Sequence, residues 1–142
     1  MIVLDTNVIS ELMRTKGDKS VKQWVASQSK TLLYTTSIAQ AEILYGIAIL
    51  PDGKKRFQLL ERADLMFSID FAERILNFDS TAASCYAKIV AQRRKLGTPI
   101  SQFDAQIAAI CLSHQATIAT RNIDDFVNCQ ITIVNPWQTS FY

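Results

Sequence analysis

The sequence predicts an α/β protein, a three-layer α/β/α sandwich in which helices cover both faces of a central, mostly parallel, five-stranded sheet. Five short apolar segments along the chain have strand character, and several of them are continuous rather than alternating. Continuous apolar strands are typical of a parallel sheet that is buried on both faces. Stretches with helical spacing and capping residues lie between these segments, so the chain is expected to alternate between strands and helices.

The expected strands are short, and most are rich in β-branched residues. They are Ile2–Leu4, Leu32–Tyr34, Ile75–Phe78, Thr117–Ala119 and Ile131–Val134. The turn signals between them are equally short, and no repeat, low-complexity tract or long linker divides the chain. We therefore expect residues 1–142 to form a single domain, which is long enough to bury a core without disulfides or zinc.

Three of the expected helices begin at a hydroxyl residue that can cap them. The caps are Thr6 before Asn7–Met13, Ser37 with Gln40, and Ser101 with Asp104. The last two pairs have the spacing of a capping box, in which each side chain satisfies a backbone N–H of the other residue. Two further helices are expected over Lys54–Phe67 and Thr81–Leu96, and Gly97 stands in the favoured position to end the second of these.

The bulk composition excludes several classes of protein. The longest apolar run, Ile43–Leu50, is interrupted by Gly46 and is far shorter than the ~20 residues that a membrane span requires. Asp5 and Glu11 interrupt the N-terminus, which has no basic region or cleavage site of an export signal, so we expect a cytoplasmic protein. Cys85, Cys111 and Cys129 lack the paired spacing of zinc or redox sites, and we expect them to be reduced core residues.

Among the histidine and the basic residues, the evidence for a catalytic or binding role is weak. His114 is the only histidine, which excludes a multi-histidine metal site, and it is expected as a polar residue in the last turn of a helix. The net charge is only +2, but two basic triplets, 54–56 and 93–95, can contact a phosphate backbone. A solvated helix face is the favoured alternative for both triplets.

Three carboxylates occupy unusual places and are the strongest candidates for chemistry. Asp5 directly follows the first strand, where a parallel sheet forms a ligand crevice at its carboxyl edge. Glu42 lies among small and apolar neighbours, and a buried carboxylate needs a cation or hydrogen bonds to compensate its lost hydration. Asp104 lies in the first turn of a helix rich in Ala and Ile. The alternatives are a helix cap for Asp5, a solvated helix face for Glu42, and the capping box for Asp104.

A further polar segment follows the fourth strand and is expected at the same edge of the sheet. It contains Asn122, Asp124 and Asp125. Asn122 can ligate a metal or a bridging water through its amide oxygen, whereas either aspartate can be a helix cap or a surface acid. Oxygen ligands select hard cations, so the set predicts Mg²⁺ or Mn²⁺ rather than zinc or copper. Such a site suits the hydrolysis of a phosphate ester.

With these acids in this order, the sequence resembles PIN-domain ribonucleases of the VapC-type toxin family, and closely resembles its FitB-like branch. The matching stretches are 2–11, Ala41-Glu42 with Gly46, 100–110, 119–122, Asp125-Phe126 and Asn135-Pro-Trp137. The resemblance implies a PIN-like fold and a Mg²⁺-dependent endoribonuclease, with Mn²⁺ as a substitute, that is the toxin of a type II toxin–antitoxin pair.

The resemblance also implies roles for individual residues and partners. Asp5, Glu42 and Asp104 would bind the metal, and the Thr6 hydroxyl would lie near it. Many relatives have a fourth Asp where Asn122 stands, so either Asn122 orients water or Asp125 compensates. Members usually form homodimers, are silenced by an antitoxin protein, and contact DNA only through that antitoxin.

Three alternatives remain open from the sequence. A stripe of Phe57, Leu60 and Leu65 either packs in the core, which is favoured, or serves the antitoxin. The whole chain could instead be a noncatalytic PIN-like module that binds RNA or protein. A small-molecule phosphohydrolase is disfavoured because the four glycines form no phosphate-binding loop.

Overall fold

The computed structural model describes residues 1–138, and its centre is a wholly parallel five-stranded sheet with the order β3-β2-β1-β4-β5. The strands are β1 (Ile2–Leu4), β2 (Leu33–Thr36), β3 (Ile75–Leu76), β4 (Thr117–Ala119) and β5 (Ile133–Val134). The predicted parallel sheet is therefore confirmed, although β3 and β5 are shorter than the apolar pattern indicated. Residues 139–142, which belong to the predicted single domain over 1–142, lie outside the described part of the chain.

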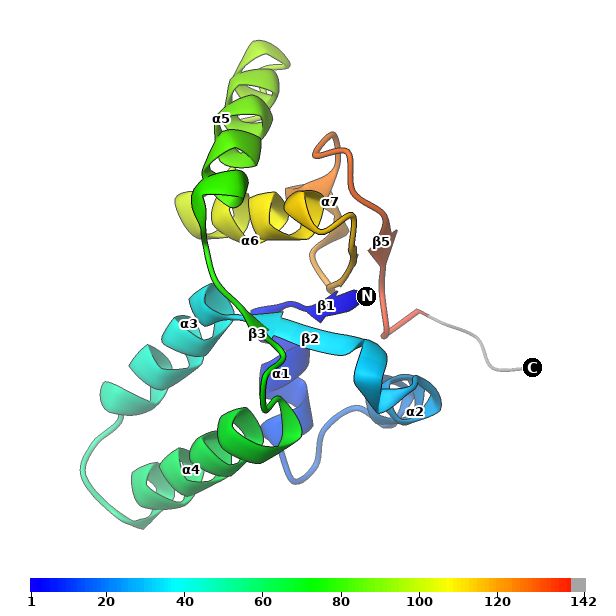
Figure 1. The fold of residues 1–142 in the computed structure, drawn as a ribbon. Helices are drawn as coiled ribbons and strands as arrows, with labels where there is room; N and C mark the ends of the chain where they lie inside the picture. Colours follow the sequence, from blue (N-terminus) through cyan, green and yellow to red (C-terminus); the bar gives the residue numbers. More distant parts are fainter. Residues whose placement is uncertain (139–142) are drawn as a thin grey trace.

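Helices cover both faces of this sheet, as the sequence predicted. They are α1 (Thr6–Met13), α2 (Lys19–Ser27), α3 (Ser37–Ala48), α4 (Lys54–Leu65), α5 (Ser80–Lys95), α6 (Gln102–Ser113) and α7 (Ile123–Phe126). Figure 1 shows α1 to α4 on one side of the sheet and α5 to α7 on the other. Successive strand residues point to opposite faces, so Leu4 belongs to the core beneath α1 to α4, whereas Val3 belongs to the core beneath α5 to α7.

The strand register decides which residues meet at the carboxyl edge of the sheet. Ile2 pairs with Leu33 of β2, and Leu4 pairs with Ala119 of β4. The backbone N–H of Asp5 then donates to the carbonyl of Ala119 at 3.0 Å. The ends of the three central strands therefore lie side by side, and the residues that follow them form one edge.

Two of the three predicted helix caps are wrong by one residue. Asp5, and not Thr6, caps α1, because its carboxylate accepts a hydrogen bond from the backbone N–H of Thr6. Thr36, and not Ser37, caps α3. In both places the chain passes from strand to helix without a loop, so the residue at the strand end is also the cap. The cap of α6 by Ser101 is confirmed.

The end of α5 is confirmed, whereas α2 was not predicted. Gly97 has φ +72° and follows the last turn of α5, a left-handed conformation that glycine adopts without steric cost. The missed helix α2 has nine residues and buries only Val21 and Trp24. Its start is set by Asp18, whose carboxylate accepts hydrogen bonds from two backbone N–H groups of the first turn.

The burial of the remaining candidates corrects one expectation. Phe57, Leu60 and Leu65 of α4 are 63%, 40% and 58% exposed, so the favoured core packing of this stripe is wrong. The three cysteines are free, and Cys111 and Cys129 are buried as expected, whereas Cys85 is partly buried. His114 caps the C-terminus of α6 and is exposed. Within residues 1–138, no helix is both long and apolar enough to span a membrane.

Candidate active site

Asp5 is the most buried acid of the candidate site, with 4% exposure. Its Oδ1 accepts from the backbone N–H of Thr6 at 2.8 Å, and its Oδ2 accepts from the Thr120 hydroxyl at 2.8 Å. The pKa of Asp5 is nevertheless raised from 3.8 to about 6, because burial and, to a smaller extent, the charges of Asp104 and Glu42 outweigh the two hydrogen bonds, which lower it. A carboxylate has room for about four hydrogen bonds, so each oxygen of Asp5 keeps a lone pair for a cation.

Glu42 reaches the same edge from α3, which begins directly after β2. Its side chain is partly buried, and its Oε1 accepts a hydrogen bond of 2.9 Å from the Thr6 hydroxyl. Burial raises the pKa of Glu42, the bond from Thr6 lowers it, and the charge of Asp104 raises it. Thr6 therefore links two acids, because its backbone N–H binds Asp5 while its hydroxyl binds Glu42.

Asp104 comes to the site from the opposite layer, in the first turn of α6. Burial raises its pKa, hydrogen bonding with Ser101 lowers it, the charge of Asp125 raises it, and the charge of Arg93 lowers it. Asp104 takes part in the capping of α6, since its backbone N–H donates to the Ser101 hydroxyl at 3.2 Å. The capping alternative and a role in the acid cluster are thus compatible.

The two residues considered for the fourth position, Asn122 and Asp125, lie at the start of α7 and within it. Asp125, in α7, acts electrostatically on Asp104. Asn122 caps α7 and its backbone N–H donates to the Thr120 hydroxyl at 3.1 Å. Within residues 1–138, the Asn122 side chain forms no hydrogen bond, and Asp124 forms no ion pair or side-chain hydrogen bond. Of the two aspartates in this segment, Asp125 is the one whose charge raises the pKa of Asp104.

Thr120 is the central residue that the sequence analysis missed. It is fully buried, and its hydroxyl donates to Asp5 and accepts from the backbone N–H of Asn122. The Asn7 side-chain amide also lies within 3.4 Å of the same hydroxyl. The signal for Thr120 was its place, because it follows β4 in register with Asp5 after β1. This residue joins the ends of the two strands into one polar network.

Arg93 has a different role from the phosphate contact considered for its triplet. It is 5% exposed, and its guanidinium donates to the carbonyls of Thr98, Asp125 and Val127 at 2.6, 2.9 and 2.9 Å. Arg93 therefore ties the end of α5 to α7 and fixes the backbone that carries Asp125. A guanidinium engaged in this way is not available to bind RNA.

The donor chemistry of this edge fits a hard divalent cation. Its ligating atoms are carboxylate, hydroxyl and amide oxygens, which Mg²⁺ and Mn²⁺ prefer. A positive ion would also relieve the desolvation and mutual repulsion that raise the pKa values of Asp5, Glu42 and Asp104. Among residues 1–138, no three Asp, Glu, His or Cys side chains are grouped closely enough to enclose an ion.

Comparison with known proteins defines the class to which this fold and this edge belong. The family model described as PIN domain matches residues 2–129, and the chain belongs to this family. It is similar to VapC ribonuclease Y4jK from Sinorhizobium fredii, with 38% identity over 138 residues that cover 97% of this chain and 99% of the relative. It is also similar to toxin FitB from Neisseria gonorrhoeae, with 39% identity over 137 residues that cover 96% and 99%.

A solved structure agrees with these relatives. A chain in the structure of FitAB bound to an IR36 DNA fragment superposes with a TM-score of 0.93 and 37% identity, covering 100% of this chain and 99% of that one. The expected PIN-like fold and the resemblance to the VapC family and its FitB-like branch are therefore confirmed.

Proposed function

We propose that this chain is a metal-dependent endoribonuclease, which cuts RNA phosphodiester bonds and acts as the toxin of a type II toxin–antitoxin system. The observation that carries the proposal is the arrangement of Asp5, Glu42 and Asp104 at one edge, where Thr6 hydrogen-bonds both Asp5 and Glu42 and the charge of Asp104 acts on both acids. Membership of the PIN-domain family supports it, as do relatives named VapC ribonuclease and toxin FitB. The whole of residues 1–142 is proposed to be one such domain.

Asp5, Glu42 and Asp104 are proposed to hold the cation, and Asp125 is proposed to complete the ligand set from its position near Asp104. The expected ion is Mg²⁺, with Mn²⁺ as a substitute, because all of these donors are oxygens. When bound, such an ion supplies positive charge that stabilises the transferring phosphoryl group and lowers the pKa of water. The ligand assignment remains a proposal that substitutions can test residue by residue.

The protein side chains have separable tasks in this proposal. Asp5 is suited to ligation rather than proton transfer, because both of its oxygens already accept hydrogen bonds from Thr6 and Thr120. Glu42 is partly buried and has a raised pKa, so it is a candidate to accept the proton of the attacking water. Asn122 is the alternative group for orienting that water through its amide oxygen.

An antitoxin protein is the proposed partner. The FitAB complex among the similar structures supports this partner, and so does the exposed stripe of Phe57, Leu60 and Leu65. Apolar side chains of this size on one helix suit docking against the apolar face of another helix. We also propose a homodimer in the cytoplasm, and contact with DNA only through the antitoxin.

Cleavage of a mixed RNA panel by antitoxin-free protein tests the proposed activity. We expect cleavage with Mg²⁺ or Mn²⁺ and none with EDTA. The cleavage rate of Asp104→Asn should fall by more than about a hundredfold, since replacing a residue that only hydrogen-bonds to a metal ligand already costs up to about that factor. Asp64→Asn is the matched control, because Asp64 is an exposed acid on α4. The fold of each variant is checked by circular dichroism and thermal unfolding.

The other outcomes identify the alternatives. Undiminished cleavage by Asp104→Asn would remove Asp104 from the site. A folded, metal-loaded wild type that binds RNA but cuts none would leave a noncatalytic PIN-like binding module. Turnover of phosphomonoesters without cleavage of RNA would identify a small-molecule phosphohydrolase.

A further inference from the structure

A groove of about 720 Å³ opens beside the acid cluster, among residues of α1, α3 and α4. Thr6 and Glu42 line this groove, so it shares a wall with the candidate active site. A ligand that lies in the groove can therefore reach Glu42 directly. We call it the α1–α4 groove.

The α1–α4 groove is predominantly positively charged. Among residues 1–138, four residues that line the groove are cations, Arg14, Lys16, Lys55 and Arg62, and the only acid that lines it is Glu42. Arg14 pairs with Glu11 at 3.5 Å, and Arg62 donates to the carbonyl of Met13 at 3.3 Å. Within residues 1–138, the ammonium groups of Lys16 and Lys55 have no hydrogen bond or ion pair. Lys16 and Lys55 are also exposed, so both ammonium groups can contact a ligand.

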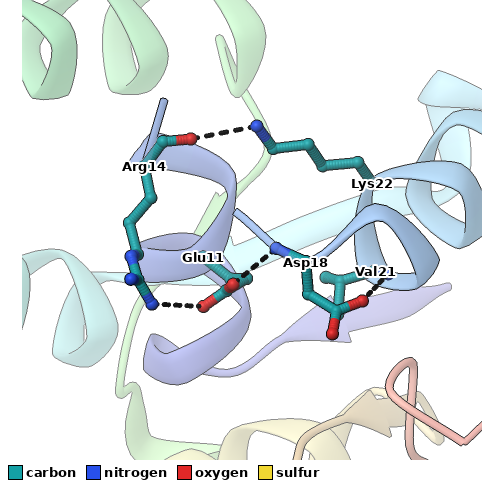
Figure 2. Close-up of polar contacts among 5 residues, drawn as sticks. All are labelled: Glu11, Arg14, Asp18, Val21 and Lys22. Carbon is teal, nitrogen blue, oxygen red and sulfur yellow. Dashed lines mark hydrogen bonds and ion pairs between the residues drawn. The ribbon is translucent and has the colours of Figure 1, made fainter. Parts of the chain in front are cut away.

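The loop that carries Lys16 is held in place by a set of polar contacts, which Figure 2 shows. Glu11 pairs with the Arg14 guanidinium and accepts from the backbone N–H of Asp18 at 2.6 Å. Lys22 of α2 donates to the carbonyl of Arg14 at 2.9 Å. Both ends of the segment 14–18 are thus tied to neighbouring helices. Lys16 is presented from a fixed loop, so less conformational entropy is lost when a ligand binds there.

Gly17 shows how closely this loop packs. A Cβ atom at Gly17 would lie 2.5 Å from the carbonyl oxygen of Glu11, which is backbone and cannot move aside by rotation. It would also lie 2.9 Å from the side chain of Lys22. Any larger residue at this position must therefore displace the loop and, with it, Lys16.

We propose that the α1–α4 groove binds the backbone of single-stranded RNA on one side of the scissile bond, with Lys16 and Lys55 contacting phosphates. This proposal rests on the ribonuclease function proposed above. RNA is a polyanion, so its phosphates are attracted to the unpaired ammonium groups that lie beside the site for its phosphodiester bond. Ile43 and Leu59 add apolar surface to the same groove. Among residues 1–138, no aromatic side chain lines the groove, so we expect RNA binding in it to depend on the phosphates and not on the base sequence.

The size of the effect follows from the release of counterions. Each phosphate contact of a single strand contributes about 0.7 to the slope of log affinity against log salt. Removing one contact should therefore weaken RNA binding about fourfold at 0.15 M salt and about eightfold at 0.05 M salt. Because the same contact is present in the ground state and the transition state, KM should rise while kcat stays constant.

The test compares Lys55→Gln and Lys16→Gln with Lys54→Gln as the matched control. Lys54 neighbours Lys55 at the start of α4 and carries the same charge, but it does not line the groove. Binding of a fluorescent mixed-sequence single-stranded RNA is measured against salt in an Asp104→Asn background, so that the RNA stays intact. Lys55→Gln and Lys16→Gln should each lower the salt slope by about 0.7, whereas Lys54→Gln should leave it near the value of the parent.

A second variant keeps the charge and moves the loop. Gly17→Ala should raise KM for RNA in the otherwise unaltered protein, as Lys16→Gln does, without a change in net charge. Thermal unfolding and Mn²⁺ affinity show whether the fold and the acid cluster are intact in this variant.

Equal salt slopes for Lys55→Gln and Lys54→Gln would overturn the proposal. So would groove variants that bind RNA normally but lose affinity for the antitoxin, since the groove would then be a protein-docking surface. The binding measurement is independent of cleavage, so it tests the groove even if the wild type cuts no RNA. Failure of the ribonuclease proposal appears instead as absence of metal-dependent cleavage in the wild type.

Discussion

Replacing the buried acid Asp5 with Asn should stabilise the metal-free protein at neutral pH while abolishing its activity. The pKa of Asp5 is raised from 3.8 to about 6 in the folded protein, so the folded state holds this proton more tightly than the unfolded chain does. The contribution of Asp5 to the free energy of unfolding is therefore greatest at pH values below its pKa in the unfolded chain, and it falls as pH rises from about 4 to about 6. Above that range the ionised carboxylate imposes a constant cost, which Asn does not carry.

The magnitude can be estimated from the shift and from the hydrogen bonds. A shift of about two pKa units corresponds to about 3 kcal/mol at neutral pH. The Asn side chain has one oxygen fewer, and the Thr120 hydroxyl, which now donates to Asp5 Oδ2, would lose its acceptor at a cost of about 1 kcal/mol. The net gain should be about 2 kcal/mol, or roughly 6 °C in Tm for a domain of this size.

Urea unfolding in EDTA at neutral pH and at about pH 3 measures this effect, because the lower value lies below the unfolded pKa of aspartate. Asp5→Asn should be more stable than the wild type at neutral pH, and the advantage should disappear at the acidic value. Asp64→Asn, an exposed acid, should show no such difference. An Asp5→Asn variant that is less stable at neutral pH, or a gain that is equal at both pH values, would refute the reasoning.

Further predictions concern the residues around this acid. Thr120→Val removes the hydroxyl that donates to Asp5, so the acid limb of the pH–activity profile should move up by roughly one pH unit, as a pH titration of kcat would show. Asp125→Asn should weaken Mn²⁺ binding measured by calorimetry, whereas Asn122→Ala should leave Mn²⁺ affinity unchanged, because Asp125 carries a charge that acts on Asp104 and Asn122 carries none. The reverse result would assign the fourth ligand to Asn122. Mn²⁺ at one hundred times its Kd should raise the free energy of unfolding of the wild type by about 2.7 kcal/mol, and that of Asp5→Asn by much less. Urea midpoints measured with and without Mn²⁺ check this.

The acids of the candidate site could be predicted from the sequence because they are charged residues in otherwise apolar segments. Asp5 follows a wholly apolar strand, and Glu42 and Asp104 stand in helices whose other residues are mostly small or apolar. A carboxylate in such a place costs free energy unless something compensates it, and this cost is visible without a structure. The parallel sheet was predictable for a related reason, since continuous apolar strands need cover on both faces.

The parts that were missed depend on contacts between distant segments. Thr120 has nothing unusual in its own sequence, and its role arises only because the register of β1 and β4 sets it beside Asp5. Arg93 resembles a solvated base in a basic triplet, but three carbonyls from other segments surround it. The apolar spacing of Phe57 and Leu60 fits a core helix equally well, and only the position of α4 leaves them exposed.

The central claim is that Asp5, Glu42 and Asp104 form one cation site, and the location of bound Mn²⁺ by anomalous X-ray scattering tests it most directly. We predict a Mn²⁺ peak at the carboxyl edge of β1, about 2.1 Å from an oxygen of Asp5 and within bonding distance of Asp104 or Glu42. The same crystals of Asp5→Asn should lose this peak. A Mn²⁺ ion bound away from these acids, or no ion at this edge at saturating Mn²⁺, would contradict the account.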